Sequence, residues 1–258
     1  MTPEELDALV GELAEFKVRG GHDWFRFSDH DVRTDEATVE IYDEIGMWGV
    51  TAADFTQALD ALPKSTKVIN LRLNSPGGGV FAGLAIANRL RAHPATVNVT
   101  VDGVAASIAS VIAMAGDQVT MARGSQMMIH NPSGVVLGGA ADMRKMADVL
   151  DQLARDSIAD SYRAKAGGTT DEWLARMSEE TWYGPAEAVA HGLADVADTG
   201  TDEDAEDEDV AARGPFELTA YGFRFPGRDA APDPVAQDRL RRSRAAVARV
   251  RDLRGGCK

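Results

Sequence analysis

The sequence predicts an α/β fold for residues 36–197, where short β-rich runs alternate with helical patterns. The run 68–73 is rich in aliphatic residues and stops at the turn 74–79, Asn-Ser-Pro-Gly-Gly-Gly, after which a helical pattern begins. The run 97–101 likewise stops before Gly103, which precedes a helical pattern rich in small residues. Strands that alternate with helices in this way are typical of a βα-repeating α/β domain.

The elements of this domain are expected in a definite order. The expected strands are 37–42, 68–73, 97–101, 119–121 and 127–130. The expected helices are 51–62, 80–92, 105–115, 140–165 and 185–191. Thr51 suits an N-cap, Pro94 follows the end of one helix, and Gly192 follows another in the C′ position that glycine favours. The long helix carries an apolar seam made by Met143, Met146, Leu150 and Leu153.

Composition divides the chain into four regions. Residues 1–35 form a polar leader, and residues 36–197 form the α/β domain. Residues 198–213 form an acidic linker that contains the run Asp-Glu-Asp-Ala-Glu-Asp-Glu-Asp, a pattern typical of a solvated segment. Residues 214–258 form an extension that ends in a basic tail.

The leader and the extension have some expected structure of their own. In the leader, residues 3–16 are expected to form a helix, and an aromatic patch follows at 24–27. In the extension, residues 216–225 are compatible with a β-hairpin, residues 226–234 form a break, and the tail 239–258 has helical spacing. The tail is free to pair with the acidic linker, with a partner protein or with nothing.

Composition also excludes several classes of function. The 258 residues carry a formal net charge of -14, which disfavours nucleic acid as a partner of the whole surface. No apolar run reaches about 18 residues, and residues 1–13 do not resemble a signal peptide, so we expect a cytoplasmic protein without a membrane partner. The single cysteine, Cys257, excludes an internal disulfide and a cysteine-based metal site, and we expect no metal or other cofactor.

Ser107 is the candidate nucleophile. It lies at the start of an expected helix directly after a strand, where unpaired N–H groups favour a developing oxyanion. Its small neighbours Ala105, Ala106 and Ala109 let a substrate backbone come close, although small residues also serve simple helix packing.

The glycine turn 74–79 is a second candidate element. Consecutive glycines accept conformations closed to other residues and expose backbone amides, which suits an oxyanion, a substrate strand or a phosphate. The turn is not a Walker A loop, because no Gly-Lys-Ser/Thr follows it. The spacing after Gly79 does not fit the dinucleotide-binding pattern either.

His130 is the candidate general base. It ends an expected strand directly before Asn131 and Pro132, and no second histidine or carboxylate stands beside it at metal-ligand spacing. The glycine turn, then Ser107 roughly 30 residues later, then His130 roughly 20 residues further on, form a set suited to acyl transfer.

Four motifs in order resemble the ClpP family of serine peptidases over about residues 38–197. They are Asn-Ser-Pro-Gly-Gly at 74–78, Gly-Val-Ala-Ala-Ser at 103–107, Met-Ile-His-Asn-Pro at 128–132 and Glu-Ala-Val-Ala-His-Gly-Leu-Ala-Asp at 187–195. The resemblance implies a ClpP/crotonase-like fold of repeated ββα units with a protruding handle helix, formed here by the helix 140–165. It also implies that two rings of copies of this chain stack through their handles.

The resemblance implies a role for each matching residue. Ser107 attacks the scissile carbonyl and His130 takes its proton. The family has an aspartate before the closing helix as the third triad member, and Glu180 stands at that position here. Glu179, or a dyad completed by water or a backbone carbonyl, is the alternative.

The backbone groups of the glycine turn receive roles by the same resemblance. The amides of Gly78 and Ile108 form the oxyanion hole. Gly77 and Gly79 bind the backbone of a polypeptide substrate.

Residues 41–46 and 48–51 resemble the ClpP-related proteases that mature phage heads. This likeness implies an endopeptidase that cleaves scaffold or coat protein without an unfoldase, in the host cytoplasm or the procapsid. A housekeeping-type ClpP subunit that degrades unfolded proteins with an AAA+ unfoldase is the alternative with the same chemistry. From other classes, a catalytically inactive ClpP-like structural ring protein and a crotonase-type enzyme stay open. A Ser–Lys peptidase would need a catalytic lysine, and no suitable lysine stands near the first strands.

Overall fold

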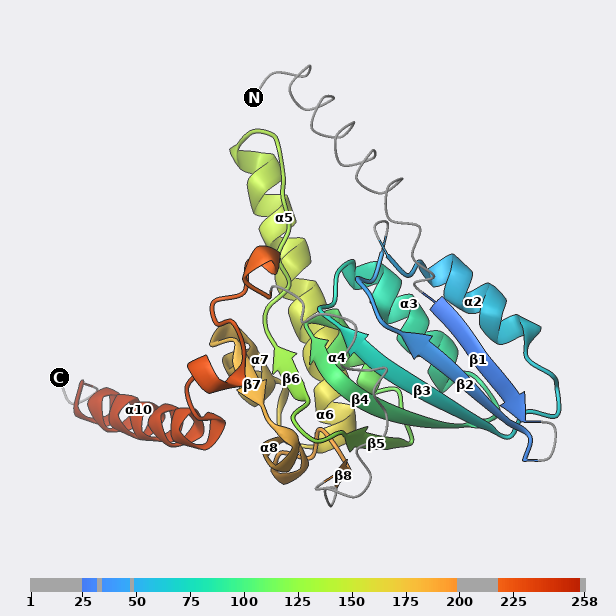
Figure 1. Cartoon of the computed structure of the whole chain (residues 1–258). Helices are drawn as coiled ribbons and strands as arrows, with labels where there is room; N and C mark the ends of the chain where they lie inside the picture. The colour runs from blue at the N-terminus through green and yellow to red at the C-terminus, as the bar shows by residue number, and fades with distance from the viewer. Residues whose placement is uncertain (1–24, 32–33, 47–48, 199–217, 256–258) are drawn as a thin grey trace.

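The structure is a computed structural model that describes residues 25–31, 34–46, 49–198 and 218–255 (Figure 1). The expected helix 3–16 and the acidic run 202–209 lie outside these residues. In the part of the chain that is described, no helix has both the length and the apolar character needed to cross a bilayer.

A sheet in the order β1-β2-β3-β4-β5-β8 forms the centre of the described structure, and β6 and β7 join it through β4. The strands are β1 (Phe25–Asp31), β2 (Glu36–Ile41), β3 (Val68–Ser75), β4 (Thr96–Ala106), β5 (Gln118–Met121), β6 (Gln126–Ile129), β7 (Thr181–Tyr183) and β8 (Val196–Ala197). β2, β3, β4, β5 and β8 pair in parallel, which is the usual result of strands alternating with helices. β1 and β7 pair antiparallel to their neighbours.

Helices cover one face of the sheet, and a long helical arm, α5, rises from the molecule (Figure 1). The helices are α2 (Ala52–Ala61), α3 (Val80–Arg91), α4 (Ile108–Ala113), α5 (Ala140–Leu153), the π-helix η1 (Ala154–Ala159), α6 (Asp160–Ala166), α7 (Thr170–Ser178), α8 (Pro185–Ala190) and α10 (Pro234–Gly255), with 3-10 turns at Leu218–Tyr221 and Arg228–Ala230. Thr51 caps α2 by accepting a hydrogen bond from the Asp54 amide at 3.1 Å, so this predicted cap is confirmed.

Alternation along the strands divides the sheet into two faces. In β2 and β3 every second residue is buried, and these apolar side chains pack under the helices in the main core. The opposite face is polar, and there Arg72 donates to Asp102 at 2.6 and 3.0 Å while the hydroxyl of Tyr42 donates to the same carboxylate at 2.6 Å. The Asp102 carboxylate is buried and is fully satisfied by these donors.

β4 positions the candidate site because it pairs with two different strands along its length. Its residues 98–101 pair with β5, and its residues 104–106 pair with β6. Met128 stands opposite Ala106 in the second pairing, so the chain leaves both strands at neighbouring points. The ends of β4 and β6 therefore lie side by side.

Three expectations differ from the structure. The helix expected from Ala105 begins only at Ile108, because residues 104–106 pair with β6. The aromatic patch assigned to the leader falls partly in β1, a strand that pairs with β2. The hairpin expected at 216–225 is wrong, since the described residues form a 3-10 turn at Leu218–Tyr221 followed by irregular chain.

The helical arm and its surroundings also differ in detail. The helix expected at 140–165 contains the π-helical segment η1, which separates α5 from α6. α5 buries none of its residues, and Met143 of the apolar seam is 53% exposed. α7 and β7 had no counterpart among the expected elements.

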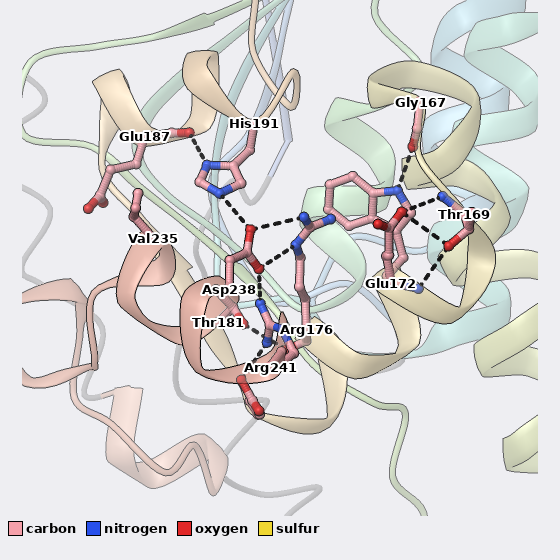
Figure 2. A network of polar contacts seen from close by, with 12 residues as sticks. Gly167, Thr169, Glu172, Arg176, Thr181, Glu187, His191, Val235, Asp238 and Arg241 are labelled. Carbon is pink, nitrogen blue, oxygen red and sulfur yellow. Dashed lines mark hydrogen bonds and ion pairs between the residues drawn. The ribbon is translucent and has the colours of Figure 1, made fainter. Parts of the chain in front are cut away.

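The extension docks on the domain through charges that Figure 2 shows from close by. Asp238 of α10 lies between Arg176 of α7, which donates to it at 3.1 Å, and Arg241 of its own helix, and His191 Nε2 is 3.5 Å away. Burial alone would raise the pKa of Asp238, but hydrogen bonds from Arg176 and Arg241 outweigh it and hold the pKa at about 2. Arg241 also pairs with Glu179. The basic tail therefore contacts the domain, at least through its first turns.

Gly83 lets α3 pack tightly against the start of α4. A Cβ at this position would lie 2.3 Å from Cγ1 of Ile108, a branched side chain that cannot swing away freely. We expect Gly83→Ala to lower the free energy of unfolding by about 1–2 kcal/mol, because the overpacking exceeds the gain in helix propensity. Urea unfolding followed by circular dichroism measures this change.

The double variant Gly83→Ala/Ile108→Ala isolates the cause. Shortening Ile108 removes the clash, so the double variant should lose less stability than the sum of the two single changes. Strict additivity would contradict the proposed packing conflict.

Candidate active site

Ser107 occupies the sharp turn between β4 and α4. Its backbone has φ 55° and ψ -128°, in the positive-φ region that side chains rarely adopt. Strain of this kind costs about 1–3 kcal/mol and persists only where the surroundings enforce it. Here the amide of Ser107 donates to the carbonyl of Met128 at 3.0 Å and ties the turn to β6. A strained strand-to-helix turn is a common way to present a nucleophilic side chain.

His130 follows directly after β6, at the neighbouring strand end. Its Nε2 lies 2.7 Å from Oγ of Ser107. When the proton of the imidazole is on Nδ1, Nε2 accepts the hydroxyl hydrogen, which is how a general base activates a nucleophile. The structure thus brings together the two side chains that the sequence selected.

Burial sets the protonation of His130. Loss of solvation lowers the pKa of the imidazole below its ordinary value of 6.5, and the negative charge of Glu180 offsets part of this effect. A lowered pKa leaves the imidazole neutral at pH 7, as a general base must be.

The glycine turn lies against Ser107, and some of its backbone groups bond to Ile45 while others point away from it. The carbonyl of Gly77 accepts from Ile45 at 2.7 Å, and the amide of Gly79 donates to Ile45 at 2.6 Å. In such a parallel bridge the N–H and C=O of the middle residue, Gly78, point away from Ile45. Among the described residues no hydrogen bond to the Gly78 amide is found, so this donor is available to a ligand.

Gly77 allows the close approach of the turn to the serine. A Cβ there would lie 2.7 Å from Cβ of Ser107 and 3.2 Å from the amide nitrogen of Ile108, and its φ of 96° also favours glycine. The Ile108 amide is the first of α4 and lacks a partner within that helix. The amide of Gly77 donates to Ser75 Oγ at 3.1 Å. The substrate-binding roles expected for Gly77 and Gly79 stay predictions, and the amides of both residues donate hydrogen bonds within the chain.

Glu180 lies near His130 without a hydrogen bond to it among the described residues. Its backbone is strained, with φ 52°, and its side chain is buried. Both carboxylate oxygens are held elsewhere: Oε1 accepts from Trp182 Nε1 at 3.2 Å and from the Phe225 amide at 2.9 Å, and Oε2 accepts from the Arg224 amide at 2.7 Å. The charge of Glu180 raises the pKa of the His130 imidazole without a hydrogen bond between the two side chains among the described residues.

An aromatic ring from the extension packs against His130. The ring of Phe223 lies nearly perpendicular to the imidazole of His130, with the ring centroids 5.5 Å apart and an interplanar angle of 88°. Phe223 also contacts Trp182 of β7 at 6.2 Å and stacks with Tyr221 at 6.1 Å. Sequence reasoning missed these residues, although the alternating aromatics at positions 221, 223 and 225 mark a segment with one apolar face.

Fold and site together define a class: an α/β protein that carries a serine–histidine pair at the ends of two adjacent parallel strands, beside a glycine turn. A family model described as Clp protease matches residues 31–199. The chain belongs to the Clp protease family.

Similar proteins agree with this assignment. The ATP-dependent Clp protease proteolytic subunit of Deinococcus radiodurans is 36% identical over 129 residues, which cover 49% of this chain and 63% of that protein. The subunit of Leuconostoc citreum is 33% identical over 161 residues, covering 60% and 78%. Subunit 2 of Chlamydia trachomatis serovar D is 35% identical over 133 residues, covering 50% and 64%. In the first and third of these relatives, the match spans less than two thirds of the relative's length.

A solved structure confirms the expected ClpP-like fold. A ClpP1 mutant from Listeria monocytogenes superposes with a TM-score of 0.56 at 24% identity, covering 64% of this chain and 92% of that one. The agreement concerns the fold alone.

The acid limb of activity tests the protonation of His130. Because burial lowers the pKa of His130, activity should fall on acidification with a midpoint below pH 6.5. Above that pH, activity should approach its maximum. Glu180→Gln removes a charge that raises this pKa, so it should move the midpoint further down. The pH dependence of kcat/KM for a fluorogenic peptide measures both midpoints. A wild-type midpoint above 7, or an upward shift in Glu180→Gln, would contradict the assignment.

Proposed function

We propose that the chain is a serine peptidase that cleaves internal peptide bonds. The 2.7 Å contact between His130 Nε2 and Ser107 Oγ, at a strained strand-to-helix turn, is the observation that supports this most directly. In the proposed reaction His130 takes the hydroxyl proton while Oγ attacks the scissile carbonyl carbon. His130 then protonates the leaving amine as the C–N bond breaks, and water releases the acyl group from Ser107 in a second round.

The oxyanion hole is proposed to consist of the amides of Gly78 and Ile108. The position of Gly77 brings the glycine turn against the start of α4, and the Gly78 amide points away from Ile45. Two amide donors near the reacting carbonyl stabilise the negative charge that develops on its oxygen.

Glu180 is proposed to assist as a fixed negative charge. When His130 accepts the proton of Ser107, its imidazole becomes positive, and a buried carboxylate nearby lowers the free energy of that state. This role requires no hydrogen bond between Glu180 and His130. Glu179 has a separate interaction, since it pairs with Arg241.

Stacked rings of this chain are the proposed assembly, with α5 as the contact between rings. α5 has no buried residue in the single chain, and Met143 and Val149 on it are 53% and 39% exposed. An amphipathic helix that buries nothing needs a partner to cover its apolar side.

Scaffold or coat proteins of a phage head are the proposed substrates. The support is the likeness of residues 41–46 and 48–51 to head-maturation proteases and the extension beyond the family match, which ends at residue 199. A proteolytic subunit that works with an AAA+ unfoldase on unfolded proteins is the second candidate, favoured by the names of the relatives, ATP-dependent Clp protease proteolytic subunits.

Reaction with a fluorophosphonate probe tests the peptidase chemistry. We expect the wild type to be labelled at Ser107 and Ser107→Ala to be unlabelled, while Ser133→Ala, which changes an exposed serine just after His130, labels like the wild type. Peptide turnover should fall about 10⁴- to 10⁶-fold in Ser107→Ala or His130→Ala, and the double variant should be little worse. An unlabelled wild type would favour the inactive ring protein.

The choice between substrates has its own experiment. If the protein matures a phage head, the coat and scaffold proteins encoded with it should be trimmed on co-expression with the wild type but not with Ser107→Ala, without ATP or an unfoldase. Equal processing by both would contradict this substrate. Degradation of an unfolded protein only when an AAA+ unfoldase and ATP are added would establish the second candidate.

A further inference from the structure

Residues 218–231, here called the aromatic cover, pack beside the site. Its apolar side chains Leu218, Phe223, Phe225 and Ala231 pack on a small core made by Val104, Ala106, Met128 and Trp182. Ala106 directly precedes Ser107, and Met128 accepts the hydrogen bond from the Ser107 amide. The aromatic cover therefore packs on the strands that carry the catalytic pair.

Phe223 is the residue of the aromatic cover that contacts the pair itself. Its ring packs perpendicular to the imidazole of His130, and the same ring also contacts Trp182 and Tyr221. Within the described residues, the hydrogen bond that His130 makes is the one to Ser107. An imidazole held at one nitrogen is free to tilt unless packing fixes its plane, and the Phe223 ring supplies that packing.

The aromatic cover also fixes the nearby charge. Its consecutive amides at Arg224 and Phe225 hold the two carboxylate oxygens of Glu180. In an ordinary triad the carboxylate binds the histidine and sets its orientation. Here the carboxylate is turned to the aromatic cover, so orientation and charge are supplied by different residues.

Ion pairs anchor the aromatic cover to the domain. Arg228 makes a two-point contact with Glu187 of α8, at 2.5 and 2.6 Å, and its amide donates to Gln126 of β6 at 2.8 Å. The Asp238 network of Figure 2 holds the following helix. Two-point arginine–carboxylate contacts with little exposure fix geometry, which is what a permanent part of a site needs.

We propose that the aromatic cover is a working part of the active site and that Phe223 is a positioning residue, which holds the His130 imidazole toward Ser107 in place of the carboxylate of a triad. This inference rests on the proposed peptidase function. The opposite role, a cover that blocks the site until it is displaced, is an outcome that the same experiment detects.

The experiment compares full-length variants by their rate of fluorophosphonate labelling and by kcat and KM on a fluorogenic peptide. Phe223→Ala should slow labelling and lower kcat about 3- to 10-fold with KM little changed, because the base is less often aligned. Phe223→Tyr keeps the aromatic ring and should restore the rate. Leu218→Ala is the matched control, since it removes apolar contact from the same cover without touching His130.

The pH profile supplies a readout that a purely structural role would not move. Removing the ring exposes His130 to water, so the acid midpoint of kcat/KM should rise toward 6.5 in Phe223→Ala and stay in place in Leu218→Ala. Among the described charged groups, Glu180 is the one whose charge acts on His130, and both variants retain it. Phe223→Leu, which keeps most of the volume, replaces Phe223→Ala if melting curves show that the alanine variant does not fold.

The outcomes separate this inference from the proposed function. Faster labelling of Phe223→Ala would show a blocking cover, and an unchanged rate and midpoint would show that the ring only fills space. Equal slowing by Phe223→Ala and Leu218→Ala would point to general loss of packing. Each of these results overturns the inference while the labelled wild type upholds the peptidase. A wild type that resists labelling overturns both.

Discussion

The backbone conformation of Ser107 depends on contacts from three separate elements. Its amide is bound by Met128 of β6, the glycine turn after β3 lies against its Cβ, and α3 presses on the first residue of α4 through Gly83. Each contact has a low free-energy cost because a small residue or a strand pairing occupies that point. A positive φ at a serine is locally unfavourable, so contacts from the surrounding sheet and helices must offset its strain energy. These three contacts together hold the turn at Ser107 in its strained conformation.

Much of this arrangement was readable in the sequence, for physical reasons. The sequences of β3 and β4 either alternate apolar with polar residues or form apolar runs, as strands do. Consecutive glycines mark the turn after β3, and Thr51 and Gly192 mark helix ends. Ser107 and His130 were selected from their place at strand ends, and the chain does bring them within hydrogen-bond distance. The start of α4 was misplaced because Ala105 and Ala106 have high helix propensity, and only the pairing with β6 draws them into a strand.

The surroundings of Glu180 could not be predicted in the same way. Its position was inferred from a family pattern, whereas its partners are backbone amides more than forty residues away in the chain. Every residue except proline carries a backbone amide, so no sequence motif predicts such a contact. The segment that supplies the amides looked like a hairpin because its aromatic residues alternate. In the structure the alternation serves packing on Trp182 and His130, which only the tertiary fold reveals.

The contact between Phe223 and His130 has a consequence for the time at which the site is complete. Roughly two dozen residues separate the end of β8 from Phe223, which synthesis at about 5 to 20 residues per second adds in roughly one to five seconds. During that interval the nascent chain contains the residues of the described strands and of the serine–histidine pair but lacks the aromatic cover. On the proposal above, the nascent chain passes this stage with a poorly aligned base. On that proposal, unfolded chains nearby are cut about 3- to 10-fold more slowly until the extension has docked.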